Sequence, residues 1–156
     1  MQTGEIIAMT DKYVMNTYSR IPIAPVTGAG ARLYDADGKE YLDFTAGIAV
    51  NSTGHCHPKV VEAICRQAAE LLHVSNLYHI QRQAELARVL AEASGLDKAF
   101  FCNSGAEANE AAIKLARRYS RVSGRSEAYE IITASGSFHG RTLGALTATG
   151  QAKYHE

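Results

Sequence analysis

The chain has 156 residues, with 16 Lys and Arg against 16 Asp and Glu and a formal net charge of zero, and 46% of its residues are apolar. This composition is typical of a globular protein and excludes a disordered tail, while the balanced charge argues against nucleic acid as the main partner. No apolar run approaches the roughly 18 residues that span a bilayer, and residues 1–13 lack the basic and apolar regions of a secretory signal, so we expect neither.

The first third of the sequence predicts an extended segment and then a hairpin. Residues 13–30 mix proline and glycine with apolar residues, which is typical of extended chain. In residues 32–44 two short apolar runs flank a turn, where Asp37-Gly38 supplies the positive φ angles that a tight turn needs. Residues 45–54 are small and glycine-bearing, and we expect them to cross between two substructures. We place a domain boundary at the end of this crossing.

Two helices are predicted in the middle of the chain. Pro58 suits the first turn of a helix, where its missing N–H costs nothing, and apolar residues follow at helical spacing as far as Leu72. A second helix is predicted from about Arg82 to Ser94, with Gly95 as its stop signal.

The remaining elements predict a βαβ unit. Residues 98–102 form an apolar run typical of a buried strand, a strong helix begins at about Ser104, and a second strand is predicted at 129–134. Within the helix, Glu110 and Lys114 have the spacing of an ion pair. Strand, helix and strand in this order favour a parallel pair of strands. The predicted fold class is therefore α/β, with a smaller hairpin-bearing part in front.

The turn after the first predicted strand is a candidate phosphate site. Ser104 to Glu107 reads S-x-x-E, a capping box, and Gly105 removes the side chain that would keep a ligand from the backbone. Free N–H groups at a helix start bind phosphate, and ligands of open α/β sheets bind beyond the carboxyl ends of the strands. A capped helix without a ligand is the alternative, because capping boxes are common.

The turn after the second predicted strand, residues 135–142, opens at the same sheet edge. Phe138 could present a flat face to a planar ring, and the planar fork of Arg141 could hold a carboxylate. His139 could act as an acid or base, although a lone histidine in a turn more often packs or forms hydrogen bonds. A phosphate-binding helix start, an aromatic ring and a cation at one sheet edge would suit an aromatic phosphorylated cofactor and an amino-acid substrate.

The cysteines and histidines predict neither a disulfide framework nor a metal site. Cys56, Cys65 and Cys102 are odd in number and widely spaced, which favours a reducing, cytoplasmic compartment. His55 and His57 flank a cysteine, but no second ligand pair at metal-binding spacing accompanies them.

Several stretches, spread along most of the chain, follow one another in a specific order and spacing: residues 34–44, 47–51, 54–58, 75–78, 103–110 and 138–142. In these stretches the sequence resembles the class III aminotransferases, enzymes that use pyridoxal 5'-phosphate (PLP) and include the acetylornithine and ornithine aminotransferases. The GIAVN and SNLY stretches look most like the acetylornithine branch.

The resemblance implies a PLP-dependent transferase of fold type I, a homodimer with active sites at the subunit interface. Residues 1–54 would be the N-terminal segment of the small domain, and residues 55–156 the incomplete start of the PLP-binding large domain, with the first part of its parallel sheet. The residues it implies for the cofactor are Ser104, Gly105 and Ala106 on the phosphate and Phe138 on the pyridine ring. Those it implies for the substrate are Arg141 on the α-carboxylate, and Tyr18, Asn76 and Tyr78 near the entrance.

The resemblance also implies a reaction, the transfer of an amino group from N-acetylornithine to 2-oxoglutarate in arginine biosynthesis. Ornithine, succinylornithine or 4-aminobutyrate as the amino donor stays open, as does a non-catalytic phosphate-binding or interaction module. Family members are longer, and their Schiff-base lysine lies downstream of the matching stretches. We therefore expect the N-terminal portion of an enzyme, with no catalytic residue in this chain and no activity of its own.

Overall fold

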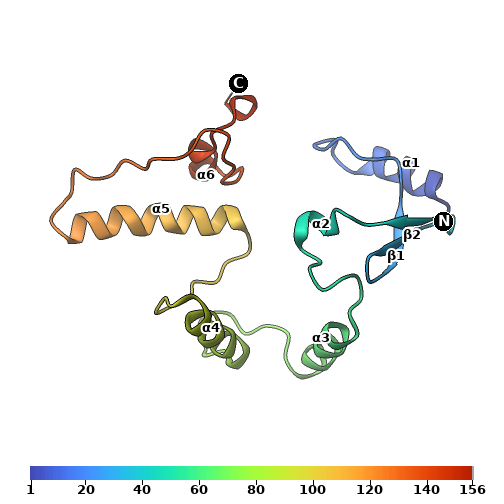
Figure 1. The fold of residues 1–156 in the computed structure, drawn as a ribbon, viewed down its shortest axis with the longest axis horizontal. Helices are drawn as coiled ribbons and strands as arrows, with labels where there is room; N and C mark the ends of the chain where they lie inside the picture. Colours follow the sequence, from blue (N-terminus) through green and yellow to red (C-terminus); the bar gives the residue numbers. More distant parts are fainter. Residues whose placement is uncertain (156) are drawn as a thin grey trace. The chain divides into compact units, whose positions relative to one another are not determined.

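A computed structural model describes residues 1–155, which form helices and one small sheet (Figure 1). The chain divides into two compact units, Met1–Ser75 and Asn76–Glu156. Residues 55–75, which the sequence assigned to the second domain, belong to the first of these units. The proposed domain boundary after residue 54 concerns a longer protein and stays a prediction.

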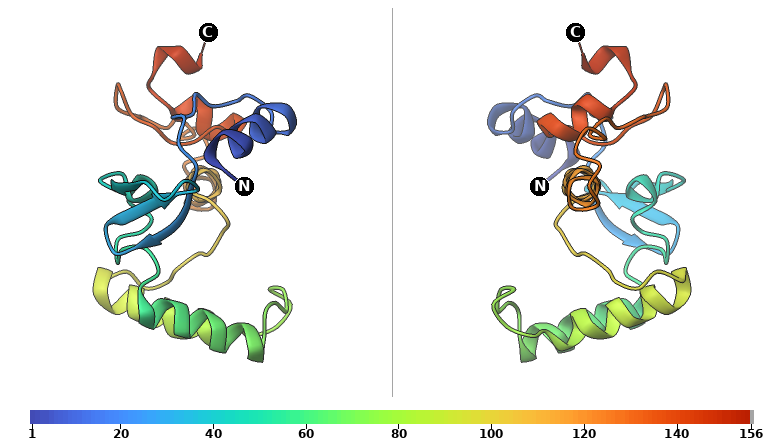
Figure 2. Two further views of the ribbon diagram at one scale, coloured as in Figure 1. Left: turned by 90° about the vertical axis from the view of Figure 1, so that its right-hand side faces the viewer. Right: turned by 90° about the vertical axis from the view of Figure 1, so that its left-hand side faces the viewer.

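The first unit contains three helices and a three-stranded antiparallel sheet in the order β1-β2-β3 (Figures 1 and 2). Its elements are α1 (Thr3–Tyr13), β1 (Pro25–Ala29), β2 (Arg32–Asp35), β3 (Glu40–Leu42), α2 (Ala46–Ala49) and α3 (Pro58–Glu70). The pairing of β2 with β3 confirms the predicted hairpin. The structure adds α1 and β1, which the sequence analysis did not predict as regular elements.

Asp35 stabilises the hairpin turn from within. Its carboxylate accepts hydrogen bonds from the N–H groups of Asp37 (3.0 Å) and Lys39 (2.8 Å) and from the Tyr41 hydroxyl (2.8 Å). Gly38 has φ +82° there, as the predicted tight turn requires. Burial raises the pKa of Asp35, but these hydrogen bonds outweigh it and hold the pKa below its ordinary value.

The crossing at residues 43–55 is pinned by Asp43. One carboxylate oxygen accepts from the N–H groups of Thr45 and Ala46, both at 2.9 Å, and the other lies 2.6 Å from Nε2 of His55. The hydrogen bond from His55 is the main cause that lowers the pKa of Asp43. Between these contacts α2 is a left-handed turn, in which Ile48 has φ +59°. Such angles are uncommon outside glycine, so the surrounding contacts must hold them.

The second unit contains α4 (Gln81–Ser94), α5 (Gly105–Val122), α6 (Leu143–Ala148) and a short 3₁₀ helix, η1 (Ala152–Tyr154). The helices predicted from sequence are confirmed at α3, α4 and α5. Pro58 begins α3, and Gly95 ends α4 in the left-handed conformation with φ +71°. The glycine stop works because no Cβ opposes that conformation.

The parallel strand pair expected at residues 98–102 and 129–134 is not formed. Residues 98–102 precede α5 and residues 129–134 follow it, and both segments are non-helical (Figure 1). Neither forms a β-ladder with the other or with any other residue in the described range 1–155. The prediction of a pair was wrong because composition marks segments that can form strands but does not supply the neighbour with which each would pair. A ladder needs a strand about 4.7–4.9 Å away, and the described residues supply none.

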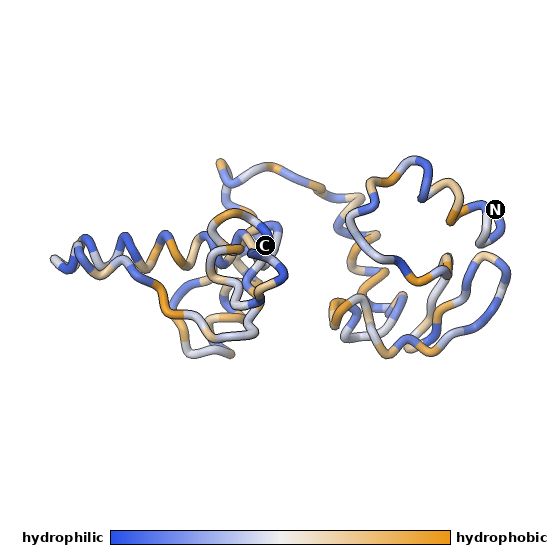
Figure 3. Tube along the Cα trace, turned by 90° about the horizontal axis from the view of Figure 1, so that it is seen from above, coloured by the Kyte–Doolittle hydropathy of each residue, from blue (hydrophilic) through white to orange (hydrophobic). Residues whose placement is uncertain are grey.

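Little of the described chain is buried. The buried apolar side chains are Ala24, Ala145 and Ala148, and the buried polar ones are Asp35 and Thr149. Large hydrophobic side chains are therefore exposed in both units. Figure 3 shows where hydrophobic residues occur along the trace. Within residues 1–155, no helix combines the length and the apolar character needed to cross a bilayer.

Candidate functional site

The start of α5 carries two backbone donors without a partner. The Ser104 hydroxyl accepts a hydrogen bond from the N–H of Glu107 at 3.2 Å, which confirms the predicted cap. The Glu107 carboxylate reaches back to the N–H of Asn103 at 2.7 Å, one residue earlier than in a standard capping box. The N–H groups of Gly105 and Ala106 form no hydrogen bond within the described part of the chain.

This helix start has the chemistry of an anion site. A Cβ built on Gly105 would meet no atom within 4 Å, so the approach to the backbone is open. α5 has 18 residues, and its dipole places partial positive charge at the same end. Two free N–H groups beside the Ser104 hydroxyl match the oxygens of a phosphate monoester.

The turn at residues 135–142 is held by the chain that returns from α6. The N–H of Gly136 donates to the carbonyl of Gly150 at 2.7 Å, and the N–H of Gly150 donates to the carbonyl of Ser137 at 3.1 Å. The N–H of His139 donates to the Thr149 hydroxyl at 3.0 Å, and Thr149 is buried. His139 is thus fixed through its backbone, as expected of a histidine in a structural turn.

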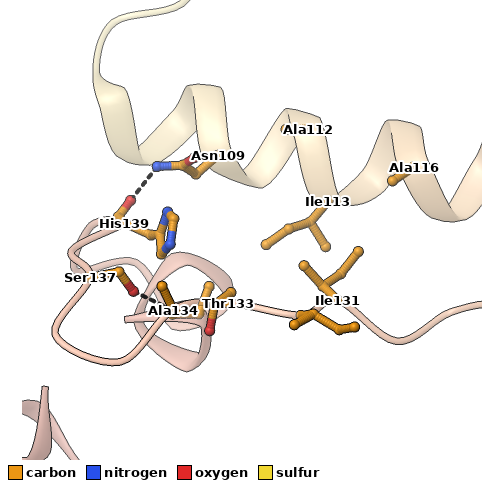
Figure 4. A pocket seen from close by; sticks show the side chains of 11 residues that line it. Asn109, Ala112, Ile113, Ala116, Ile131, Thr133, Ala134, Ser137 and His139 are labelled. Carbon is orange, nitrogen blue, oxygen red and sulfur yellow. Dashed lines mark hydrogen bonds between the residues drawn. The ribbon is translucent and has the colours of Figure 1, made fainter. Parts of the chain in front are cut away.

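The structure brings this turn onto the first turns of α5. The side-chain amide of Asn109 donates to the carbonyl of His139 at 2.6 Å (Figure 4). Gly140 is buried with φ +133°, and a Cβ there would come within 2.6 Å of the Ala106 Cβ. Only glycine permits this approach. The two turns singled out in the sequence therefore lie against each other.

Glu110 makes a further connection that sequence reasoning missed. One of its carboxylate oxygens accepts from the Thr142 hydroxyl (2.6 Å) and from the N–H groups of Gly144 (2.9 Å) and Ala145 (3.2 Å). The bond from Thr142 is the largest cause that lowers the pKa of Glu110, with the two backbone bonds adding to it. The carboxylate thus caps α6, instead of forming the expected ion pair with Lys114.

Phe138 and Arg141 lie on the exposed side of the turn, next to Tyr154. The Phe138 ring is 53% exposed and lies 5.9 Å from the Tyr154 ring, centroid to centroid, at a tilt of 54°. The guanidinium carbon of Arg141 lies 5.6 Å from the centroid of Tyr154. The hydrogen bond with Arg141 is the main cause that lowers the pKa of Tyr154. No local motif marks Tyr154, so the sequence offered no signal for it.

The three residues expected near a substrate entrance line two hollows, one in each unit. Asn76 and Tyr78 line a hollow of about 440 Å³ beside Phe100 and Phe101, and no residue of the turn at 135–142 lines it. Tyr18 belongs to the first unit, where it lines a separate hollow.

A groove of about 430 Å³ lies between α5 and residues 131–134 (Figure 4). Side chains such as Ile113 and Ile131 line it, and the His139 ring faces it. The groove therefore follows the extended segment that lacks a strand partner. As to metals, residues 1–155 contain no group of three or more His, Cys, Asp or Glu side chains that could hold an ion.

Comparison with known proteins gives the family. Residues 13–156 match the model of a family described as aminotransferase class-III. The chain belongs to the class III aminotransferase family. The acetylornithine aminotransferase of Caldanaerobacter subterraneus subsp. tengcongensis is 60% identical over 151 residues, which are 97% of this chain and 38% of that protein. That of Methanocaldococcus jannaschii is 58% identical over 151 residues, 96% of this chain and 38% of that protein.

Solved class III structures show the same fold. The ornithine aminotransferase of Toxoplasma gondii, whose structure is described with partial occupancy of PLP at its active site, has a TM-score of 0.87 and 31% identity, covering 99% of this chain and 37% of that one. This likeness confirms the predicted fold, the N-terminal part of a fold type I transferase. The chain spans under two fifths of these relatives' length, so most of each relative lies outside the matched region.

Proposed function

We propose that this chain forms the N-terminal part of a PLP-dependent aminotransferase that moves an amino group from N-acetylornithine to 2-oxoglutarate. The observation that carries the proposal is the 60% identity to an acetylornithine aminotransferase across 97% of the chain. The matched region includes both turns of the candidate site. The relative from Methanocaldococcus jannaschii, which is 58% identical, carries the same name, and this favours the acetylated donor.

The residues at the start of α5 fit the phosphate of PLP. The donor set consists of the unpartnered N–H groups of Gly105 and Ala106 and the hydroxyl of Ser104, and a Cβ at Gly105 would enter open space. The nearest carboxylate on α5, that of Glu107, accepts hydrogen bonds from the backbone N–H and the side-chain amide of Asn103. When bound, PLP supplies the electron sink on which amino-group exchange depends.

The turn at 135–142 supplies the remaining contacts. We assign the half-exposed ring of Phe138 to the face of the cofactor's pyridine ring, where a planar side chain restricts tilting. We assign Arg141 to the α-carboxylate, because its planar fork binds a carboxylate through two parallel hydrogen bonds. Tyr18, Asn76 and Tyr78 are proposed to lie near the substrate entrance of the whole enzyme.

The finer properties of the whole protein follow from the same assignment. We propose a homodimer that works in the cytoplasm, in arginine biosynthesis, with amino acids and 2-oxo acids as its substrates. The three free cysteines suit a reducing compartment. The chemistry requires a lysine that binds the cofactor covalently, and by the resemblance that residue lies outside these 156 residues.

The test is a comparison of amino donors on the native protein that carries this sequence. Its intact mass is measured first, and kcat/KM is then determined with 2-oxoglutarate for N-acetylornithine, ornithine, succinylornithine and 4-aminobutyrate. We expect the highest kcat/KM for N-acetylornithine. A higher kcat/KM for another of these donors would mean that this donor, and not N-acetylornithine, is the substrate. If the protein transferred an amino group from none of the four donors and bound no PLP, the result would favour a non-catalytic module.

A further inference from the structure

The best-buried part of the second unit is the junction of α5, the turn and α6. Ala145 is 0% exposed and Thr149 is 1% exposed, and Gly140 beside them is also buried. Every other segment of this unit lies nearer the surface. The packing therefore concentrates where the turn that carries Phe138 and Arg141 meets the phosphate-binding end of α5.

Glu110 is the charged group at this junction. Its carboxylate oxygen gathers three donors from α6 and the residue before it, and the partners lie 32 to 35 residues away in sequence. Gly144 permits the contact, since a Cβ at that position would come within 2.4 Å of the carboxylate. α6 itself is only six residues long and has no side-chain cap of its own. Glu110 therefore replaces the missing N-cap from a neighbouring helix.

Phe138 and Arg141 depend on this anchoring. The Phe138 ring lies against the Tyr154 ring, and the Arg141 guanidinium lies beside the same ring. The backbone on either side of Phe138 and Arg141 is bound to α5. Asn109 binds the backbone carbonyl of His139, and Glu110 binds the hydroxyl of Thr142 and the N–H of Gly144, just after Arg141.

We infer that Glu110 is a positioning residue, which fixes the turn on α5 and so sets where Phe138 and Arg141 stand relative to the phosphate-binding N–H groups. The roles of those two residues rest on the proposed function, whereas the anchoring itself does not. Glu110 touches neither substrate nor cofactor in this assignment. It acts through the backbone of residues 142–145.

The test uses three variants of the native protein. Glu110→Ala removes all three acceptor contacts, and Glu110→Gln keeps one carbonyl oxygen in the same place. Glu92→Gln is the matched control, because Glu92 lies on α4, its side chain is 65% exposed, and it pairs with Arg88 on its own helix. Hydrogen exchange of the peptide covering 139–146 reports on the anchoring in every variant, independently of activity.

We expect Glu110→Ala to accelerate exchange at Gly144 and Ala145 by about ten-fold or more and to raise KM for the amino donor by a similar factor, with a much smaller change in kcat. Glu110→Gln should restore most of both values, and Glu92→Gln should leave both unchanged. Unchanged exchange in Glu110→Ala would overturn the anchoring. Faster exchange with an unchanged KM would overturn the positioning role.

The outcome separates this inference from the proposed function. If the wild-type protein prefers a different amino donor, the proposed substrate fails, and the same KM comparison with that donor still decides the role of Glu110. If Glu110→Ala does not fold, Glu110→Gln alone tests the inference. The glutamine side chain in this variant has no charge but keeps an acceptor oxygen, so a large increase in KM without faster exchange in Glu110→Gln would overturn the inference.

Discussion

A polypeptide of residues 1–156, expressed by itself, should fail to form a stable monomer. The structure exposes 12944 Å², whereas a folded monomer of 16.8 kDa exposes about 7700 Å². Even with about 1600 Å² subtracted for an interface of standard size, roughly 3600 Å² of excess surface remains, of which about 2000 Å² is apolar at the usual share.

That area corresponds to a large missing stabilisation. At about 25 cal/mol per Å², burying it would contribute about 50 kcal/mol, several times the net stability of an ordinary domain, about 5–15 kcal/mol. Helix faces that include Ile64 (62% exposed) and Leu115 (70% exposed) would stay in water. We expect the isolated polypeptide to bind a hydrophobic dye and to associate.

The assay is size-exclusion chromatography with light scattering, followed by calorimetry and dye binding, with the native protein as the comparison. Large assemblies, strong dye binding and no cooperative heat absorption are expected. A monodisperse monomer of 16.8 kDa with a cooperative unfolding transition and no dye binding would refute the reasoning. It would mean that the exposed apolar faces find partners within the chain.

Three further predictions concern the native protein. Ser104→Ala should weaken binding of inorganic phosphate and lower the free energy of unfolding by about 1 kcal/mol, because the helix loses its cap, as titration calorimetry and urea denaturation would show. Gly140→Ala should cost about 1–3 kcal/mol in the same denaturation experiment, because a Cβ cannot fit beside Ala106 and the φ angle is unfavourable. Asp43→Asn should make stability less dependent on acid pH. The hydrogen bond from His55 lowers the pKa of Asp43 in the folded state. The stabilisation from this group is therefore fully present above the pKa of the unfolded state, about 4, and is lost as the pH falls through the lower pKa of the folded state. Unfolding measured as a function of pH would detect this change.

The same chain offers control variants for these predictions. Ser123→Ala changes a serine at the other end of α5, and Gly4→Ala adds a Cβ where no atom lies within 4 Å. Equal losses in Ser104→Ala and Ser123→Ala would contradict a specific N-cap. A Gly140→Ala protein as stable as Gly4→Ala would contradict the close packing. An acid profile of Asp43→Asn identical to wild type would show that the hydrogen bond with His55 does not matter for stability.

The sequence was sufficient wherever a few adjacent residues determine the local structure. Pro58, Gly95 and Ser104 mark the ends of three helices, and each acts through its own backbone or side chain within one turn. The hairpin after β1 was predictable for the same reason, because Asp37-Gly38 requires only its neighbours. The start of α5 could therefore be predicted as a candidate phosphate site from its own residues.

What the sequence could not predict depends on residues distant in the chain. Residues 129–134 have the composition of a strand, yet pairing requires a neighbour that composition does not specify. Glu110 has the spacing of an ion pair with Lys114. Only the fold shows that its carboxylate accepts hydrogen bonds from residues more than 30 positions away. Tyr154 became part of the site through its contact with Arg141, for which no motif exists.

The unpaired segments at 98–102 and 129–134 also bear on how relatives of this chain are made. In these relatives the matched N-terminal region is 38% of the protein, so the ribosome makes most of the chain after it. At about 5–20 residues per second, the two segments emerge on the order of ten seconds before the rest is complete. During that interval their backbone groups and apolar side chains are open to wrong partners. Chaperone binding to the nascent chain should therefore concentrate on these two segments until the downstream strands are synthesised.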